Sequence, residues 1–441
     1  MSIYIVKSSF FKERIQMTEN LLKDNIRNLI FDEEQEERHR LNEKFSSYYL
    51  GDHAILHDPR RRRRYRIVAN FCKRIIDEAT SILISKPFSP ELGNHLTNMD
   101  IVHLALLHGN SWALCYRKDG EFSYKAILDS EIFASWDEKT DSLKEVLRVY
   151  TPLNVKHEKL ILDLYQDKML HRFSTDNSLS ENSDFKYEGS YLHGFNRLPF
   201  FHFAVGFNAS QSRYGISDLT GLLALQDAFN AHESDWSDIL DYHGFPQLVL
   251  KNIENLGSGT TSAEKEMDDG VYFTRTIFKR GVDEILLVSG SEADVKYVPR
   301  ELATESFREK RDELKTTIFN LSCTPLVDKN SLAGNVAGVT IKLLYKDAET
   351  KARLHSSRLS FKFREMFNFL NEAAKSNERI DEIIFNLSFP TNETEIIANL
   401  TSSIQGGLLS RESALEIHPF INNPEKERAR LDNENKGKEK I

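Results

Sequence analysis

The arrangement of helical segments around a short insertion constrains the fold of this chain more than any other sequence feature. Two amphipathic segments, residues 218–242 and 300–321, bracket an insertion at residues 244–298 that contains strand-like pieces and a Gly/Ser/Thr-rich loop. Apolar residues recur at every seventh position in both segments, at Leu222, Phe229 and Trp236 in the first and at Phe307, Leu314 and Leu321 in the second. This spacing is typical of a helix with one buried face. We therefore expect the two helices to flank the insertion like the sides of a hairpin.

A long uninterrupted helix is expected further along the chain. Residues 339–375 contain neither glycine nor proline. A continuous helix over this range would be about 55 Å long, at about 1.5 Å per residue. The loop before it, residues 323–338, carries two glycines. Alternating apolar residues predict a half-buried strand at 383–389, followed after Pro390 by two short helices and a charged tail that we expect to be frayed.

The N-terminal half combines helices with a β-rich module. Residues 12–49 and 67–83 have helical composition or spacing, and Pro87 ends the second helix. Turn signals then separate short segments between Ile101 and Val205. Strands are expected at residues 111–116, 122–127, 144–150 and 159–165. The expected fold class is α+β and mainly helical, with long helices, a β-rich module and a small α/β insertion.

Charge and motif content argue against several classes of protein. The formal net charge is −9, whereas proteins that grip nucleic-acid phosphates usually carry a positive balance. The sequence has no glycine-rich phosphate loop followed by lysine and no HExxH motif. Cys72, Cys115 and Cys323 lack any metal-ligand or redox spacing. We therefore predict no enzyme, no catalytic residue, no metal and no cofactor. The lack of a long apolar run predicts no membrane contact.

Arg60, Arg61, Arg62, Arg63 and Arg64 form an uninterrupted basic run. Such a run is compatible with a contact to nucleic-acid phosphates. In an acidic chain we favour a solvated loop or one that forms salt bridges with a neighbouring subunit. The sequence alone does not decide between these interpretations.

Three aspartates of the first amphipathic segment, Asp227, Asp238 and Asp241, lie near one face of a helix by their spacing. They are compatible with a metal site or a general acid–base pair, with a solvated helix face, or with the negative lining of a pore. From the residues alone we favour the solvated face.

Several short motifs follow one another in an order that is more specific than any one of them. They are Tyr48-Tyr49-x-Gly51-x-His53, Lys86-Pro87, Gly215-x-Ser217-Asp218-Leu219, Thr324-Pro325, Gly334-Asn335-Val336-Ala337-Gly338, Phe385-x-Leu387-x-Phe389-Pro390 and Gly407-Leu408-Leu409-Ser410-Arg411-Glu412. This order resembles the portal proteins of siphophage-type tailed phages from about Tyr48 to Glu434. The chain departs from the family pattern at Ile84-Ser85, where a glycine is expected, and in its short C-terminal region.

The resemblance implies a division into the parts of a portal subunit. These parts are a wing at 1–217, a first stem helix at 218–243, a clip at 244–298, a second stem helix at 299–322, a tunnel loop at 323–338, a long wing helix and strand at 339–389, and a crown and C-terminal tail at 390–441. It further implies that the tunnel loop, with Asp328, Lys329, Asn330 and Ser331, approaches DNA. Asp227, Asp238 and Asp241 are then expected to line a channel that repels the DNA backbone.

By the same resemblance the chain forms a dodecameric ring at one capsid vertex, through which double-stranded DNA is packaged and ejected. The implied partners are further copies of the chain, the terminase large subunit, a head-completion or adaptor protein, and the major capsid and scaffolding proteins. The implied location is the virion, and the host cytoplasm during assembly. Two rival functions remain open: a metal-dependent hydrolase that uses the Asp227–Asp241 carboxylates, and a helical scaffold protein without a pore.

Overall fold

A computed structural model describes most of the chain. The described residues are 19–59, 65–152, 159–175, 179–180, 183–209, 213–244, 248–251, 265–268, 271–277, 284–289, 294–297, 304–326, 338–390, 393–421 and 423–438. The predicted DNA-proximal residues Asp328, Lys329, Asn330 and Ser331 and the basic run Arg60–Arg64 lie outside them.

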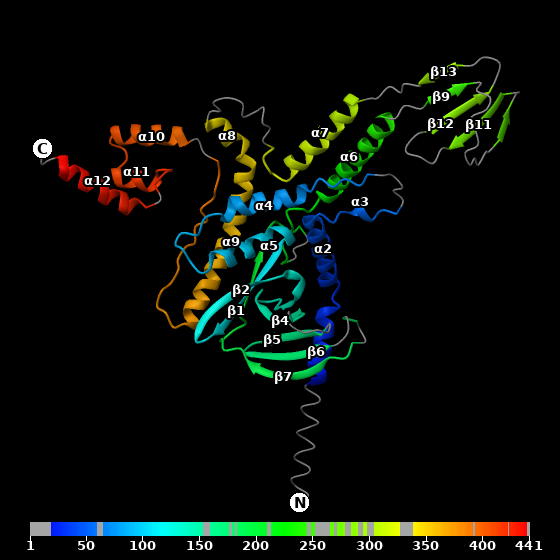
Figure 1. The fold of residues 1–441 in the computed structure, drawn as a ribbon. Coiled ribbons are helices and arrows are strands. Elements are labelled where there is room, and N and C mark those ends of the chain that lie inside the picture. Colours follow the sequence, from blue (N-terminus) through cyan, green and yellow to red (C-terminus); the bar gives the residue numbers. More distant parts are fainter. Residues whose placement is uncertain are drawn as a thin grey trace, which may run out of the picture. The chain divides into compact units, whose positions relative to one another are not determined.

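The chain forms two compact units, whose helices and strands are labelled in Figure 1. The first unit consists of Met1–Ser46, Lys73–Thr220 and Phe319–Ile441, and the second of Ser47–Cys72 and Gly221–Ile318. The predicted β-rich module and long helix therefore fall in the first unit. Most of the predicted stem falls in the second unit, together with the whole predicted clip.

The first unit contains a five-stranded antiparallel sheet whose strands follow chain order. Its strands are β3 (Ile132–Trp136), β4 (Leu143–Tyr150), β5 (Leu160–Gln166), β6 (Met169–Thr175) and β7 (Lys186–Leu192). A helix at residues 19–30 (dark blue in Figure 1) buries Ile26, Leu29 and Ile30 against this sheet. The sequence predicted β4 and β5 but missed β3, β6 and β7. In β7 the residues are mostly exposed and give no clear apolar alternation.

A second, three-stranded antiparallel sheet has the order β2-β1-β8. Its strands are β1 (Asn110–Lys118), β2 (Glu121–Ile127) and β8 (Phe200–Ala204), and the helices of this region are α4 (Phe71–Ile84), α5 (His95–His108) and α9 (Lys346–Ala373). Phe363 of α9 packs on Phe203 of β8 at 4.6 Å between ring centroids. The long helix is thus held against the β-rich module by aromatic side chains in the core.

A close backbone approach explains the glycine of the Gly215-x-Ser217-Asp218 motif. A Cβ atom on Gly215 would lie 2.2 Å from the carbonyl oxygen of Val205 and 2.3 Å from that of Gly109. The neighbouring Ile216 amide donates to the same Val205 oxygen at 2.8 Å, and the Asp218 amide donates to the oxygen of Leu106 at 3.1 Å. Only glycine fits where these backbones meet, and this contact fixes the position of Asp218.

The structure corrects the expected start of the first stem helix. The helix α6 spans Leu223–Gly244, rather than beginning at Asp218. Residues 218–222 form turns instead: the Ser217 hydroxyl accepts a hydrogen bond from the Leu219 amide at 3.0 Å, and Gly221 has a φ of +80°. Local side-chain capping by Ser217 and the left-handed Gly221 prevent the helix from extending further back.

The long helix is not continuous either. It consists of α8 (Gly338–Leu344) and α9, which meet at Tyr345. Backbone hydrogen bonds to and from Tyr345 persist, but its ψ of 2° departs from the helical value, so the helix is irregular at this residue. The expected strand at 383–389 is reduced to one β-bridge between Ile384 and Ser89, because the segment pairs with a loop rather than with a strand.

The second unit contains α3 (Ala54–His57), α6 and most of α7 (Thr304–Leu321). Phe307 of α7 packs on Trp236 of α6 at 4.7 Å, so these helices lie side by side as predicted. The insertion between them forms a five-stranded sheet of order β10-β11-β12-β9-β13, in which only β12 and β9 are parallel. Its strands are β9 (Leu248–Lys251), β10 (Lys265–Asp268), β11 (Val271–Ile277), β12 (Glu284–Ser289) and β13 (Asp294–Tyr297).

The C-terminal region is more helical than expected. The helices α10 (Glu393–Gln405) and α11 (Arg411–Ile417) confirm the prediction, with the Ser410 hydroxyl capping α11 through the Ser413 amide at 3.1 Å. The tail forms a third helix, α12 (Pro424–Lys438). Asn423 caps it by accepting from the Lys426 amide at 2.9 Å, and acidic residues in its first turn favour a helix N-terminus. Among the described residues, no helix is both long and apolar enough to span a bilayer.

Candidate functional site

In the second unit, residues 65–70 and Phe71, the first residue of α4, run along α6, and we call residues 65–71 the strap. Every second strap amide donates to a side chain of that helix. The pairs are Tyr65 N with Asp238 Oδ1 at 3.2 Å, Ile67 N with Ser234 Oγ at 2.9 Å, Ala69 N with Asn230 Oδ1 at 3.1 Å, and Phe71 N with Gln226 Oε1 at 3.2 Å. Two residues of extended chain advance by about 6.6 Å. Four residues of helix rise by about 6 Å, so the two spacings match.

The predicted acidic residues take part in the same contacts. The hydroxyl of Tyr48 donates to both oxygens of Asp227 at 2.8 and 2.7 Å, and that of Tyr65 donates to Asp241 at 2.8 Å. Burial, followed by the bond to Asp227, raises the pKa of Tyr48 well above its usual value. The three aspartates are therefore half-buried and hydrogen-bonded within their unit. Their place in a channel stays a prediction.

The metal-site interpretation gains no support from this geometry. In the part of the chain that the structure describes, no group of three or more His, Cys, Asp or Glu side chains could hold a metal ion.

In the first unit, Ser322 and the first four residues of the predicted tunnel loop form what we call the loop base, residues 322–326. The last turn of α7 ends there in a Schellman motif: the Thr324 amide donates to the Phe319 oxygen at 3.0 Å, and the Cys323 amide to the Asn320 oxygen at 3.1 Å. Cys323 occupies the left-handed position of this motif with a φ of +56°. The direction in which the chain leaves the helix is thereby fixed.

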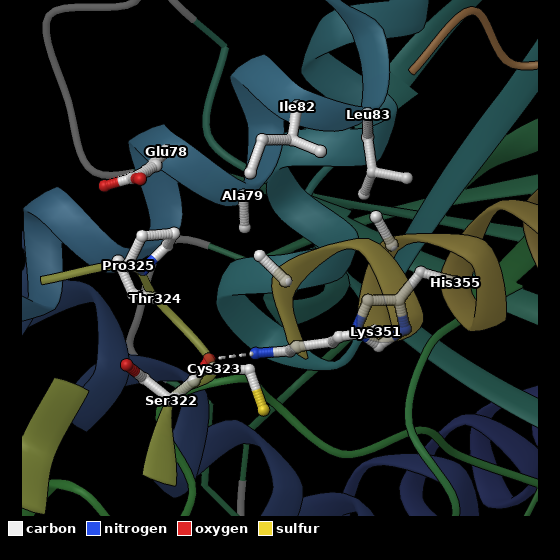
Figure 2. A pocket seen from close by; sticks show the side chains of 12 residues that line it. Glu78, Ala79, Ile82, Leu83, Ser322, Cys323, Thr324, Pro325, Lys351 and His355 are labelled. Carbon is white, nitrogen blue, oxygen red and sulfur yellow. Dashed lines mark hydrogen bonds between the residues drawn. The ribbon is translucent and has the colours of Figure 1, made fainter. Parts of the chain in front are cut away.

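Two cations hold the loop base from two different helices. Lys351 of α9 donates to the carbonyl oxygen of Ser322 at 3.0 Å (dashed in Figure 2). Arg74 of α4 donates to the carbonyl oxygen of Pro325 at 3.5 Å, and its guanidinium group lies 4.7 Å from the ring centroid of Phe319. A cation beside the last carbonyls of a helix is favoured by their partial negative charge.

The same lysine neutralises a buried carboxylate. The Asp218 side chain, only 5% exposed, lies 2.8 Å from Lys351 Nζ and 3.1 Å from His355 Nε2. Burial opposes its charge, but the attraction of Lys351 and the contact with His355 outweigh burial and hold the pKa of Asp218 below its usual value. A cavity of about 20 Å³, lined by residues of α4, the loop base and α9, adjoins the group (Figure 2). It is large enough for about one water molecule.

Sequence reasoning did not single out Arg74, Lys351 or His355. Lys351 and His355 are four positions apart on a helix, and His355 falls among the apolar residues of its buried side. The one available signal in the sequence was therefore a polar residue, His355, among apolar residues on the buried side of the helix. This signal does not identify the residues that His355 contacts.

Cys323 provides a local test of the loop-base geometry. Replacing it with glycine should leave the free energy of unfolding unchanged or raise it by up to about 1 kcal/mol, because glycine adopts φ > 0 without steric cost. Replacing it with valine should lower that free energy by about 1–2 kcal/mol, because a β-branched residue is strained there. Urea unfolding of both variants measures this. Equal destabilisation by the two substitutions would contradict the left-handed assignment.

The chain matches the family described as "Phage portal protein, SPP1 Gp6-like" over residues 28–98 and 96–440. It is 23% identical to the portal protein of Bacillus phage SPP1 over 343 residues, which cover 73% of this chain and 63% of that protein. It is also 23% identical to the portal protein of Clostridium phage phiCD119 over 429 residues, which cover 86% of this chain and 89% of that protein.

Similar solved structures come from gene transfer agent (GTA) particles. The neck of a native particle computed with C12 symmetry matches with a TM-score of 0.43 and 13% identity, covering 79% of this chain and 89% of that one. The neck of an empty particle computed with C6 symmetry matches with a TM-score of 0.44 and 11% identity, covering 84% and 91%. At TM-scores this low, the likeness says nothing about the assembly of this chain.

Proposed function

Since this chain belongs to the SPP1 Gp6-like family of phage portal proteins, we propose that it assembles into a dodecameric ring at one capsid vertex, the channel for DNA packaging and ejection. The family match over nearly the whole chain is the observation that carries this proposal. The order of structural elements supports it, because two adjacent helices flank a separate small sheet and are followed by α8 and α9.

We assign the parts of a portal subunit to the observed elements. α6 and α7 form the stem, the sheet β9–β13 the clip, residues 323–338 the tunnel loop, α8 and α9 the long wing helix, and α10–α12 the crown. The tunnel loop, with Asp328, Lys329, Asn330 and Ser331, approaches DNA. Asp227, Asp238 and Asp241 add negative charge to the channel side of the stem, where like charge keeps DNA from adhering.

The proposed partners follow from the same assignment. The clip docks the terminase large subunit during packaging and a head-completion or adaptor protein afterwards, and the wing contacts the major capsid and scaffolding proteins. Assembly takes place in the host cytoplasm, and the final location is the portal vertex of the virion. We propose no catalytic role for the chain, and ATP hydrolysis then belongs to the terminase.

Native mass spectrometry together with negative-stain imaging tests the ring. We expect annular particles of about twelve subunits with a central hole, because a closed cyclic assembly gives every subunit the same two neighbours. A stable monomer or dimer at high concentration would contradict the proposal.

We further propose that the basic run Arg60–Arg64 forms salt bridges with a neighbouring subunit. A variant with serine at these five positions should then form fewer rings, whereas normal rings with altered DNA packaging would indicate a DNA contact.

A further inference from the structure

We propose that Lys351 is a positioning residue that couples Asp218, just before the first stem helix, to the loop base that follows the second. Its ammonium group lies 2.8 Å from Asp218 Oδ2 and 3.0 Å from the Ser322 carbonyl oxygen. The charge on Asp218 thereby determines how firmly the start of the loop 323–338 is held. The role assigned to that loop rests on the proposed portal function, but the coupling itself is a property of the single chain.

Lys351 interacts with both the Asp218 carboxylate and the Ser322 carbonyl oxygen, and each of these groups needs a cation or a donor. Asp218 is nearly fully buried, so its carboxylate is stable only with a cation nearby. The Ser322 carbonyl is at the C-cap of α7, where the helix itself supplies no donor for the last carbonyl groups. A lysine ammonium has three donors in a compact group. Holding the ammonium in place at one acceptor therefore also holds it at the other.

The long helix carries this link between segments that are far apart in the sequence. Lys351 and His355 are one turn apart on α9, and both contact Asp218. The position of Asp218 is itself fixed by its amide bond to Leu106 and by the close approach at Gly215. The Asp218 carboxylate is therefore held by two side chains of α9, and one of them, Lys351, connects it to the loop base.

The second cation of the loop base is independent of this link. Arg74 holds the Pro325 carbonyl from α4, and its ion-pair partner is Glu78 on the same helix at 3.7 Å. Loss of the Asp218 charge leaves that contact in place. We therefore expect a local loosening around Cys323 and Thr324 and not a general loss of the loop base.

Amide hydrogen exchange tests the coupling directly. In an Asp218→Asn variant, the neutral amide no longer attracts the Lys351 ammonium, and we expect the Cys323 and Thr324 amides to exchange about tenfold faster. Neither amide contacts Asp218, since they donate to Asn320 and Phe319. Exchange is measured at neutral pH by mass spectrometry, with fragmentation that resolves residues 319–326.

Asp163→Asn is the matched control. Asp163 is another buried carboxylate of the first unit, and it is bonded to Arg172 at 2.7 and 2.8 Å. Its neutralisation also destabilises the unit, but it has no link through Lys351. Faster exchange at Cys323 and Thr324 in Asp218→Asn alone supports the proposal. Unchanged exchange in that variant, or the same acceleration in both variants, overturns it. Neither result depends on ring formation, so a failed ring proposal would be recognised separately.

Discussion

Replacing Arg38 with methionine should lower the free energy of unfolding of the first unit by about 3–5 kcal/mol. Arg38, in α2 (Glu33–Leu50), forms a buried ion pair with Asp129, whose side chain is fully buried. It also donates to the carbonyl oxygen of Ile132 at 2.7 Å and lies 4.3 Å from the ring centroid of Tyr214. Methionine fills a similar volume but leaves the Asp129 carboxylate buried without a cation.

Thermal or urea unfolding of matched variants checks this prediction. Arg40→Met, two positions further along the same helix, removes an exposed pair with Glu37 and should leave stability nearly unchanged. The double variant Arg38→Met/Asp129→Asn should recover part of the loss, because the uncompensated charge is then removed. Asp129 keeps other donors, the Trp112 indole and the Asn42 amide, each at 2.7 Å. Equal effects of the Arg38 and Arg40 variants would contradict the buried-pair argument.

Acidification should destabilise the first unit well before its carboxylates are protonated. Two buried histidines, His108 and His202, and the half-buried His39 are held neutral. Burial, reinforced by Arg38, lowers the pKa of His39 to about 4, and burial lowers the pKa of His108 to about 4. Burial lowers the pKa of His202 to about 3, although Asp129 opposes this shift. His202 is stacked on Trp112 at 4.4 Å and bonded to Asn110, and the residue is largely shielded from water.

The sign of the pH effect follows from where protons bind. Between pH 6.5 and about 4 the unfolded chain protonates these histidines and the folded chain does not. Stability is therefore full above pH 6.5 and falls as the pH drops towards 4. Each histidine contributes a loss of up to about 3 kcal/mol, at about 1.36 kcal/mol per pKa unit.

Urea unfolding at a series of pH values measures this loss. A His202→Gln variant should lose less stability on acidification than the unmodified chain. His57→Gln, at an exposed position of the second unit, serves as the control substitution outside the first unit. A free energy of unfolding that stays constant from pH 6.5 to 4 would show that the buried histidines titrate normally in the folded chain.

Periodic and local signals carried most of the information in the sequence. The helix–insertion–helix order, the strands β1, β2, β4 and β5, and the cap of α11 at Ser410 depend on spacing and turn chemistry within a few residues. The motif order also indicated the portal family, which the family match confirms. These features are readable because each is determined by neighbours along the chain.

The tertiary structure alone decided which polar groups meet. The strap amides match side chains four residues apart on α6, and Asp218, Ser322 and Lys351 meet although they lie in three different segments. The break at Tyr345 and the start of α6 at Leu223 were also decided at this level. Hydrogen bonds and ion pairs between distant segments leave no periodic pattern in either segment. Their partners are set by the backbone positions that apolar packing has already fixed.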